Sequence, residues 1–285
     1  MEITAAMVKE LREKTGAGIL DAKKALVEND GDMDKAMEYL RQKGIASADK
    51  KMGRIAAEGI ISSLVDANVG AMVEVNCETD FVAKNEDFIS AVNSVVEVVA
   101  KQNPADVEAL NKETVEGATV EDFIKEKIAK IGEKITIRRF VRYEGQIATY
   151  IHNKKIGVLL QYEGDDAVMA KDICLHIASN APEFVSRKEI PQSVIDEETR
   201  IEMGKDDLAN KPDNIKEKIV TGRVDKLMAS KCLMEQAFVK NPDLTIEKLT
   251  EGKLTIKSFT RFALGEGLEK KQENFAEEVM NQIKG

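Results

Sequence analysis

The chain of 285 residues contains no Trp, three Cys and two His. Cys77, Cys174 and Cys232 lie far apart with no CxxC pair, which argues against a disulfide framework and against a zinc site. Each cysteine is instead expected to be a small buried hydrophobe. His152 and His176 are too few and too separated for a histidine metal cluster. The sequence therefore predicts no bound metal and no cofactor.

Long apolar runs are also missing, and none approaches the ~20 residues that span a bilayer. The N-terminal segment carries Glu2 and passes directly into helical periodicity, unlike a signal peptide or an Arg-rich transit peptide. We therefore expect a bacterial-type cytoplasmic protein with no membrane contact. Lys and Arg number 42 against 51 Asp and Glu, a net charge of −9, which argues against direct nucleic-acid binding and favours protein partners.

Catalytic motifs are absent as well. The sequence has no GxGxxG turn, no GxxxxGK[ST] loop, no GxSxG elbow and no HExxH. Gly16-Ala17-Gly18 and Gly265-Glu266-Gly267 are typical of helix stops. Catalytic triads can assemble from distant residues. Two histidines without a motif nevertheless predict that the protein is not an enzyme.

The length exceeds a typical single domain of ~100–200 residues, so two or more units are expected. The first ~50 residues show the pattern of three short helices in a compact domain. Thr4 is expected to cap the first helix and Asp32 the third. Residues 46–54 contain few large apolar side chains and read as a linker or a solvated helix.

Beyond residue 54 the periodicity changes between strand and helix. Strands are expected at 59–65, 69–75, 135–143, 146–151, 156–162 and 255–264, and helices at 80–101, 120–131 and 165–181. The segments Val69–Val75 and Ile156–Tyr162 resemble each other, and each leads into a long helix through an acidic loop. This similarity predicts a strand–strand–helix unit that occurs twice.

Residues 191–232 have no strand pattern and are highly charged. Val194, Ile201 and Leu208 recur every seven residues, which predicts the seam of an antiparallel, coiled-coil hairpin. Two ordinary surface helices packed on a core are an equal alternative. An amphipathic helix is expected over 272–283, either packed on the core or contacting a partner.

The most informative segment runs from Asn76 to Asn85, where a strand gives way to a helix. Asp80 is expected to cap that helix, because a carboxylate there pairs with free N–H groups and the helix dipole. Phe81 follows directly. It either packs on its own core or forms an exposed wedge for a partner, as binding hot spots do.

Several segments, in chain order, resemble the bacterial elongation factor Ts family, the nucleotide-exchange factors of elongation factor Tu. They are Val8–Leu26 (VKELREKTGAGILDAKKAL), Glu74–Asn85 (EVNCETDFVAKN), Lys130–Glu133 (KIGE), Ala181–Phe184 (APEF), Arg261-Phe262 and Gly265–Lys270 (GEGLEK). The resemblance covers the whole chain, and EVNCETDFVAKN is the most specific of these motifs.

The resemblance implies an α+β fold with antiparallel sheets and five parts. These are a ubiquitin-associated-like three-helix domain (1–54), a core N-subdomain (55–140), a related core C-subdomain (141–190 and 233–265), an inserted coiled-coil hairpin (191–232) and a C-terminal helical module (266–285). The ubiquitin-associated likeness is one of scaffold and does not imply ubiquitin binding.

The resemblance also implies which residues act. Residues implied to displace Mg²⁺ from the partner are Asp80, Phe81, Val82 and Ala83. Residues implied to bind the partner are Thr79, Lys84, Asn85, Arg12, Ile19, Leu20 and His152, the last with an ordinary exposed loop histidine as its alternative.

The function implied is nucleotide exchange in translation elongation: binding of GDP-bound elongation factor Tu, disturbance of its Mg²⁺ site and phosphate loop, and release of GDP. A heterodimer with the GTPase is expected, with a two-to-two assembly as the alternative. A second class of function stays open, a non-catalytic scaffold or chaperone-like subunit that binds through the helical head and the hairpin.

Overall fold

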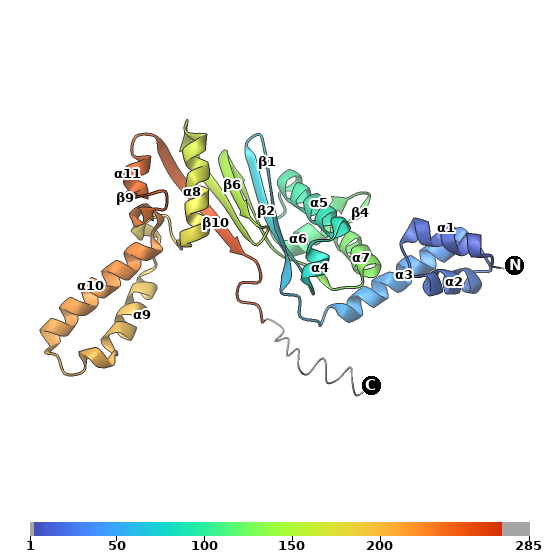
Figure 1. Ribbon diagram of the computed structural model, residues 1–285, viewed down its shortest axis with the longest axis horizontal. Helices are drawn as coiled ribbons and strands as arrows, with labels where there is room; N and C mark the ends of the chain where they lie inside the picture. Colours follow the sequence, from blue (N-terminus) through green and yellow to red (C-terminus); the bar gives the residue numbers. More distant parts are fainter. Residues whose placement is uncertain (1–2, 270–285) are drawn as a thin grey trace. The chain divides into compact units, whose positions relative to one another are not determined.

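The structure, a computed structural model, describes residues 3–269, apart from the side chains at 45–47 and 49 (Figure 1). The described chain divides into two units. Unit 1 holds the residues up to Leu64, Ala71–Arg142 and those from Phe262, and unit 2 holds Val65–Gly70 and Tyr143–Arg261. The predicted helix at 272–283 lies outside the described residues.

Unit 1 opens with three helices, α1 (Ala5–Thr15), α2 (Ile19–Glu28) and α3 (Met33–Lys51). The Thr4 hydroxyl accepts from Met7 N at 3.3 Å, and the Asp32 carboxylate accepts from Lys35 N at 3.1 Å, so both predicted caps are confirmed. Gly16 ends α1 in the left-handed region, at φ 69°. The small core of this head consists of Val8, Leu11, Ala22, Ala25, Leu26 and Ala36. Because α3 runs to Lys51, most of residues 46–54 is helical, which agrees with the helix alternative and not with a linker.

The sheet of unit 1 has the order β1-β2-β5. Its strands are β1 (Glu58–Asp66), β2 (Val69–Cys77) and β5 (Ile135–Glu144). The accompanying helices are α4 (Asp80–Ala83), α5 (Glu86–Gln102), α6 (Val107–Lys112) and α7 (Val120–Ile131). The central strand β2 is buried from Gly70 to its end. Burial on both faces is usual for a central strand covered on both sides, so the polar residues in β2 must find partners inside the protein.

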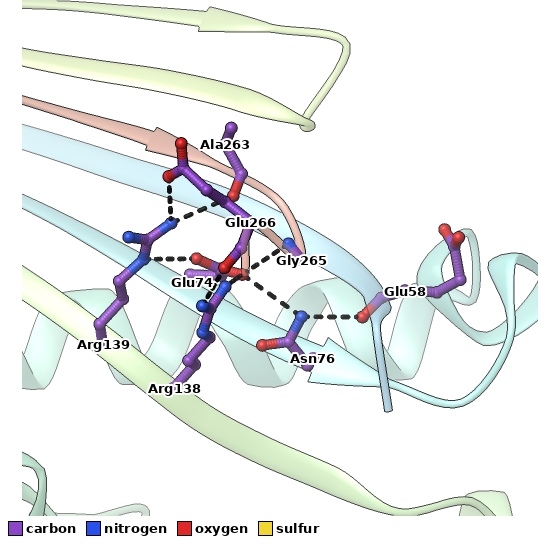
Figure 2. Close-up of polar contacts among 8 residues, drawn as sticks. All are labelled: Glu58, Glu74, Asn76, Arg138, Arg139, Ala263, Gly265 and Glu266. Atoms are coloured by element: carbon purple, nitrogen blue, oxygen red, sulfur yellow. Dashed lines mark hydrogen bonds and ion pairs between the residues drawn. The ribbon is translucent and has the colours of Figure 1, made fainter. Parts of the chain in front are cut away.

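Glu74 is the main polar residue of β2, and its side chain is fully buried. Its carboxylate accepts from Arg138 at 2.9 Å, from Arg139 at 2.6 Å and from Gly265 N at 2.9 Å (Figure 2). The Arg139 guanidinium also donates to Ala263 O at 3.1 Å and lies 4.3 Å from the centroid of the Phe262 ring. This network joins β2, β5 and the turn after β10, three segments that are far apart in the sequence.

Unit 2 is built around a second sheet, with the order β10-β7-β6. Its strands are β6 (Gln146–His152), β7 (Ile156–Gly164) and β10 (Leu254–Ala263), and α8 (Ala167–Asn180) follows β7. β6 and β7 pair antiparallel, from Gln146↔Tyr162 to His152↔Ile156. In both units the second strand of a hairpin is central, a helix follows it, and a later strand completes the sheet. The strand–strand–helix order predicted from the two similar segments thus occurs in each unit.

Helices α9 (Gln192–Met203) and α10 (Asp213–Lys231) pack on each other. Their apolar residues join a cluster of their own that contains Leu208, Val220, Val224 and Met228. Ile201 and Ile215 are 47% and 44% exposed. The predicted seven-residue seam is therefore wrong at Ile201, because the apolar cluster between the helices does not include it, and Ile215 at the start of α10 is also outside this cluster.

Other differences from the sequence concern short elements. The expected helix at 80–101 is two helices. Asn85 lies outside the helical conformation after α4, and its side chain caps the start of α5. No elements were predicted over 103–119 or 233–253. These stretches contain α6, β3 (Thr114–Val115), β4 (Ala118–Thr119), β8 (Ala237–Phe238), β9 (Asn241–Thr245) and α11 (Ile246–Thr250). Within residues 3–269, no helix has both the length and the apolar character needed to cross a membrane.

Candidate functional site

The junction between β2 and α5, residues 78–85, is called the corner below. Its first helical turn, α4, begins at Asp80, and the cap is Thr79, whose hydroxyl accepts from Val82 N at 3.3 Å. The prediction that Asp80 caps this helix is therefore wrong. The Thr79 hydroxyl, one residue earlier, already accepts the free N–H, and the Asp80 carboxylate instead pairs with Lys84 Nζ at 2.6 Å.

Phe81 points its ring into solvent and is 80% exposed. The alternative in which it packs on its own core is thus excluded. The chain is fixed directly after it, because the Asn85 side chain accepts from Asp87 N at 2.8 Å and from Phe88 N at 3.3 Å. Phe88 itself is fully buried. The corner therefore presents an exposed aromatic ring between two capped helix starts.

A carboxylate from the segment between α7 and β5 holds the base of the corner. Glu133 follows α7, which ends at Gly132 in the left-handed region, at φ 91°. One Glu133 oxygen accepts from Glu78 N at 3.2 Å and from Thr79 N at 3.0 Å, and the other accepts from the Thr79 hydroxyl at 2.7 Å. These three hydrogen bonds are called the Glu133 clamp. Sequence reasoning missed them, since 54 positions separate Thr79 from Glu133.

Glu78 makes a second connection between the corner and the segment before β5. Its carboxylate accepts from Lys134 N at 2.7 Å and from the Arg54 guanidinium at 3.2 Å. Lys134 Nζ in turn donates to Arg54 O at 2.9 Å. The end of β2, the start of β5 and the segment after α3 are thereby tied together at the base of the corner.

Cys77, the residue directly before the corner, is not a reactive nucleophile. Burial, and then the neighbouring Glu133 carboxylate, raise the pKa of Cys77 to about 12, and its thiol donates to Thr79 O at 3.2 Å. A thiol with that pKa stays protonated and inert near neutral pH. All three cysteines are free and buried, as predicted. In the part of the chain that the structure describes, no group of three His, Cys, Asp or Glu is placed to hold a metal.

The remaining predicted residues lie in both units. In the head, Arg12 is exposed, and Ile19 and Leu20 at the start of α2 are 58% and 83% exposed. In unit 2, His152 is exposed at the end of β6, where its ring nitrogens contact Tyr150 Oη at 3.1 Å and Asn153 Nδ2 at 3.2 Å.

Within the corner, the side chains of Thr79 and Asn85 act as helix caps, and Lys84 pairs with Asp80. Roles for these three residues in partner binding stay predictions, as do those of Arg12, Ile19, Leu20 and His152.

Comparison with known proteins decides the family. A family model described as "Elongation factor TS" matches residues 78–266, a stretch that begins at the corner. Elongation factor Ts of Thioalkalivibrio sulfidiphilus is 51% identical over 292 aligned residues, with both chains covered in full. Elongation factor Ts of Chromobacterium violaceum is 50% identical, over 98% of this chain and 97% of that one. The chain belongs to the elongation factor Ts family.

A third relative, elongation factor Ts of Alkalilimnicola ehrlichii, is 46% identical with full coverage of both chains. Full coverage means that the likeness to elongation factor Ts includes the head and the helix pair α9–α10 as well as the two sheets. The Glu133 clamp lies wholly within the residues that the elongation factor Ts family model matches, since it joins residues 78 and 79 to residue 133.

Proposed function

We propose that the corner is the part of this chain that releases GDP from elongation factor Tu. Nucleotide exchange on elongation factor Tu is the role of the elongation factor Ts family, and this chain has that role in translation elongation. The observation that supports the corner is the 80% exposure of Phe81 on a turn fixed at both ends. A rigidly presented aromatic side chain is the usual anchor of a binding hot spot.

In the proposed mechanism, Phe81 enters between side chains of GDP-bound elongation factor Tu. Asp80, with Val82 and Ala83, then displaces the Mg²⁺ ion and the phosphate loop of the GTPase. Mg²⁺ links phosphate oxygens to the protein in such sites, so its displacement weakens GDP binding. This chain makes and breaks no covalent bond and is not an enzyme in that sense. Coupling is reciprocal: a factor that weakens GDP binding is itself released when nucleotide rebinds.

The head is proposed to be a ubiquitin-associated-like scaffold that binds the GTPase through Arg12, Ile19 and Leu20. Two adjacent apolar residues at the start of α2, both more than half exposed, support this surface. The helix pair α9–α10 is proposed to be a coiled-coil hairpin, supported by its own apolar cluster. His152 is proposed as a further contact. The complex is proposed to be a heterodimer in the cytoplasm, where translation takes place, with a two-to-two assembly as the alternative.

The test measures release of a fluorescent GDP analogue from elongation factor Tu. We expect the parent chain to accelerate release and Phe81→Ala to reduce that acceleration about 30-fold, which corresponds to a hot spot of about 2 kcal/mol. The matched control is Val168→Ala in unit 2, which removes another apolar side chain that is 74% exposed. Val168→Ala is expected to behave as the parent.

Equal rates for Phe81→Ala and the parent would show that the corner is not the active part. A chain that bound elongation factor Tu without accelerating release would favour the second class of function, a passive scaffold or chaperone-like subunit.

A further inference from the structure

We infer that Glu133 is a positioning residue for nucleotide exchange: its clamp fixes the direction in which α4 presents the Phe81 side chain. This inference rests on the proposed function of the corner. Glu133 does not need to touch the partner GTPase. It acts through Thr79, which caps the turn that carries Asp80 and Phe81.

The clamp supplies acceptors for two backbone N–H groups just before α4 and for the hydroxyl that caps this helix. The first backbone N–H groups of a helix have no partner within the helix. The Thr79 hydroxyl takes up one of them, at Val82 N, and is itself oriented by donating to Glu133 at 2.7 Å. The backbone N–H groups of Glu78 and Thr79 donate to the other Glu133 oxygen. Hydrogen bonds to a carboxylate are about twice as strong as neutral ones.

α4 needs such outside support because it is only four residues long. A single helical turn gains too few internal hydrogen bonds to offset its own ordering. Phe81, at 80% exposure, gives the turn little packing in return. Its geometry is therefore set by the groups that hold its two ends, and the clamp connects the Thr79 end to the segment just before β5.

Unit 2 provides an internal comparison. Its helix α8 also starts after a central strand, with Asp166 as the cap accepting from Met169 N at 2.8 Å. There the last residue of β7, Gly164, approaches the start of β10 so closely that an added Cβ would lie 2.4 Å from Lys253 O. No side chain fits between the two. α8 has fourteen residues and presents no aromatic ring at its start.

The loops before the third strand differ in the same sense. Glu133 and Lys134 separate the left-handed Gly132 from β5, whereas Lys253 alone separates the left-handed Gly252 from β10. Unit 1 thus has one more residue between the glycine and the third strand. This longer connection contains Glu133, whose carboxylate forms the clamp. The comparison associates the clamp with the unit that carries Phe81.

The experiment compares Glu133→Ala, Glu133→Gln and Thr79→Val with the parent, over a range of factor concentrations. The readout is the maximal release rate of the GDP analogue from elongation factor Tu and the concentration that gives half of it. We expect Glu133→Ala to lower the maximal rate about tenfold or more, because a misplacement of about 1 Å at an acting group has effects of that size. The half-saturating concentration should change less than about threefold, since the head surface is untouched.

Glu133→Gln keeps one carbonyl acceptor for the two N–H groups and should recover part of the maximal rate. Thr79→Val keeps the shape of the side chain but loses the hydroxyl, and should reproduce much of the Glu133→Ala defect. It therefore keeps the clamp testable if Glu133→Ala folds poorly. The matched control is Asp166→Ala, which removes the equivalent cap in unit 2 and should leave release unchanged. A uniform loss of stability would affect the control as much as the clamp variants.

Amide hydrogen exchange of residues 80–84 provides a readout that does not depend on activity. Faster exchange there in Glu133→Ala, with α8 unchanged, is the expected result. Unchanged exchange at 80–84, or a Glu133→Ala chain with the maximal rate of the parent, would overturn the clamp. Equal release by Phe81→Ala and the parent would instead overturn the proposed function of the corner, and hydrogen exchange would still decide whether Glu133 holds α4.

Discussion

In both units a helix with a side-chain cap starts directly after the central strand, and yet only in unit 1 does that helix start present an aromatic ring. In unit 1 the cap is Thr79, and the second residue after it is Phe81, 80% exposed. In unit 2 the cap is Asp166, and the second residue after it is Val168, 74% exposed. The topology of a hairpin followed by a helix therefore places an exposed apolar side chain at this position in both units.

What differs is how the junction is fastened. Unit 1 inserts a separate turn, α4, and holds it with the Glu133 carboxylate. Unit 2 runs directly into α8 and closes the junction by backbone contact at Gly164. Exposure at a helix start is thus a property of the topology, whereas a side chain presented in one fixed direction requires extra polar contacts. Only the arrangement in unit 1, with these extra polar contacts, has the character of a wedge.

The central strands differ in a parallel manner. Glu74 in β2 and Gln161 in β7 occupy the same place in the two similar segments Val69–Val75 and Ile156–Tyr162. Glu74 is fully buried against two arginines, whereas Gln161 donates to Glu144 O at 2.7 Å and accepts from the Ser258 hydroxyl at 2.9 Å. One unit uses ionic contacts where the other uses neutral ones.

The largest expected effect comes from exchanging these two residues. Glu74→Gln leaves two arginines without their carboxylate, and removal of one partner from a buried pair costs about 3–5 kcal/mol. We expect about 3 kcal/mol here, because Arg138 and Arg139 are 22% and 30% exposed at their side chains. Gln161→Glu should cost about 1 kcal/mol or less, since its surroundings are partly exposed. Urea unfolding of both variants measures the difference, and equal costs would remove the contrast between the sheets.

The next effect concerns the exposed apolar positions. A chain with both Phe81→Val and Val168→Phe has the same composition as the parent but carries the ring on the other unit. We expect its GDP release to be about 30-fold slower than that of the parent, as for loss of a hot spot. Its stability should stay within about 0.5 kcal/mol, as is usual for surface substitutions. Parent-like release by this chain would show that the two helix starts are interchangeable.

The smallest effect is a pH dependence. Burial raises the pKa of Glu74, but the hydrogen bond from Gly265 N and those from the two arginines outweigh it, and the pKa lies below its ordinary value of 4.5. A carboxylate with a lowered folded-state pKa contributes stability above its unfolded-state pKa and loses it as the pH falls through the folded value. The stability difference between the parent and Glu74→Gln should therefore be constant from about pH 7 to 5 and shrink below about pH 4.5. Unfolding measured from pH 7 to 3 checks this, and an undiminished difference at pH 3 would contradict it.

Much of the fold follows from periodicity, whereas the site depends on contacts that periodicity does not encode. The caps at Thr4 and Asp32 and the strands on either side of the Ala67-Asn68 turn are local signals, and they could be predicted. The break between α4 and α5 could not, because an apolar helical pattern continues past Asn85 while the Asn85 side chain caps a new helix. Two-residue strands such as β3 are too short to show any period.

Polar partners that are far apart in the sequence could not be predicted for a different reason. A lone Glu74 in an apolar strand signals that a buried cation is needed, but Arg138 is 64 positions away and one of many basic residues. Asp80 and Phe81 stood out because a strand gives way to a helix there, and the resemblance of their motif implied their roles. The sequence left open whether Phe81 packs on its own core or is exposed, because both are compatible with a helix start. Glu133 gave no signal of its own beyond its place in a matching segment.

The ion pairs of Glu74 also bear on how this chain tolerates change in length. The chain leaves unit 1 after Arg142 and returns at Phe262, and Arg139 contacts both Phe262 and Ala263 beside the buried carboxylate. The segments where the chain leaves unit 1 and re-enters it are thus held together by the contacts of Arg139. The entropy needed to close an intervening stretch grows only slowly with its length. Insertions or deletions between these two points, in the α9–α10 pair above all, can accumulate while the ends of the excursion stay where they are.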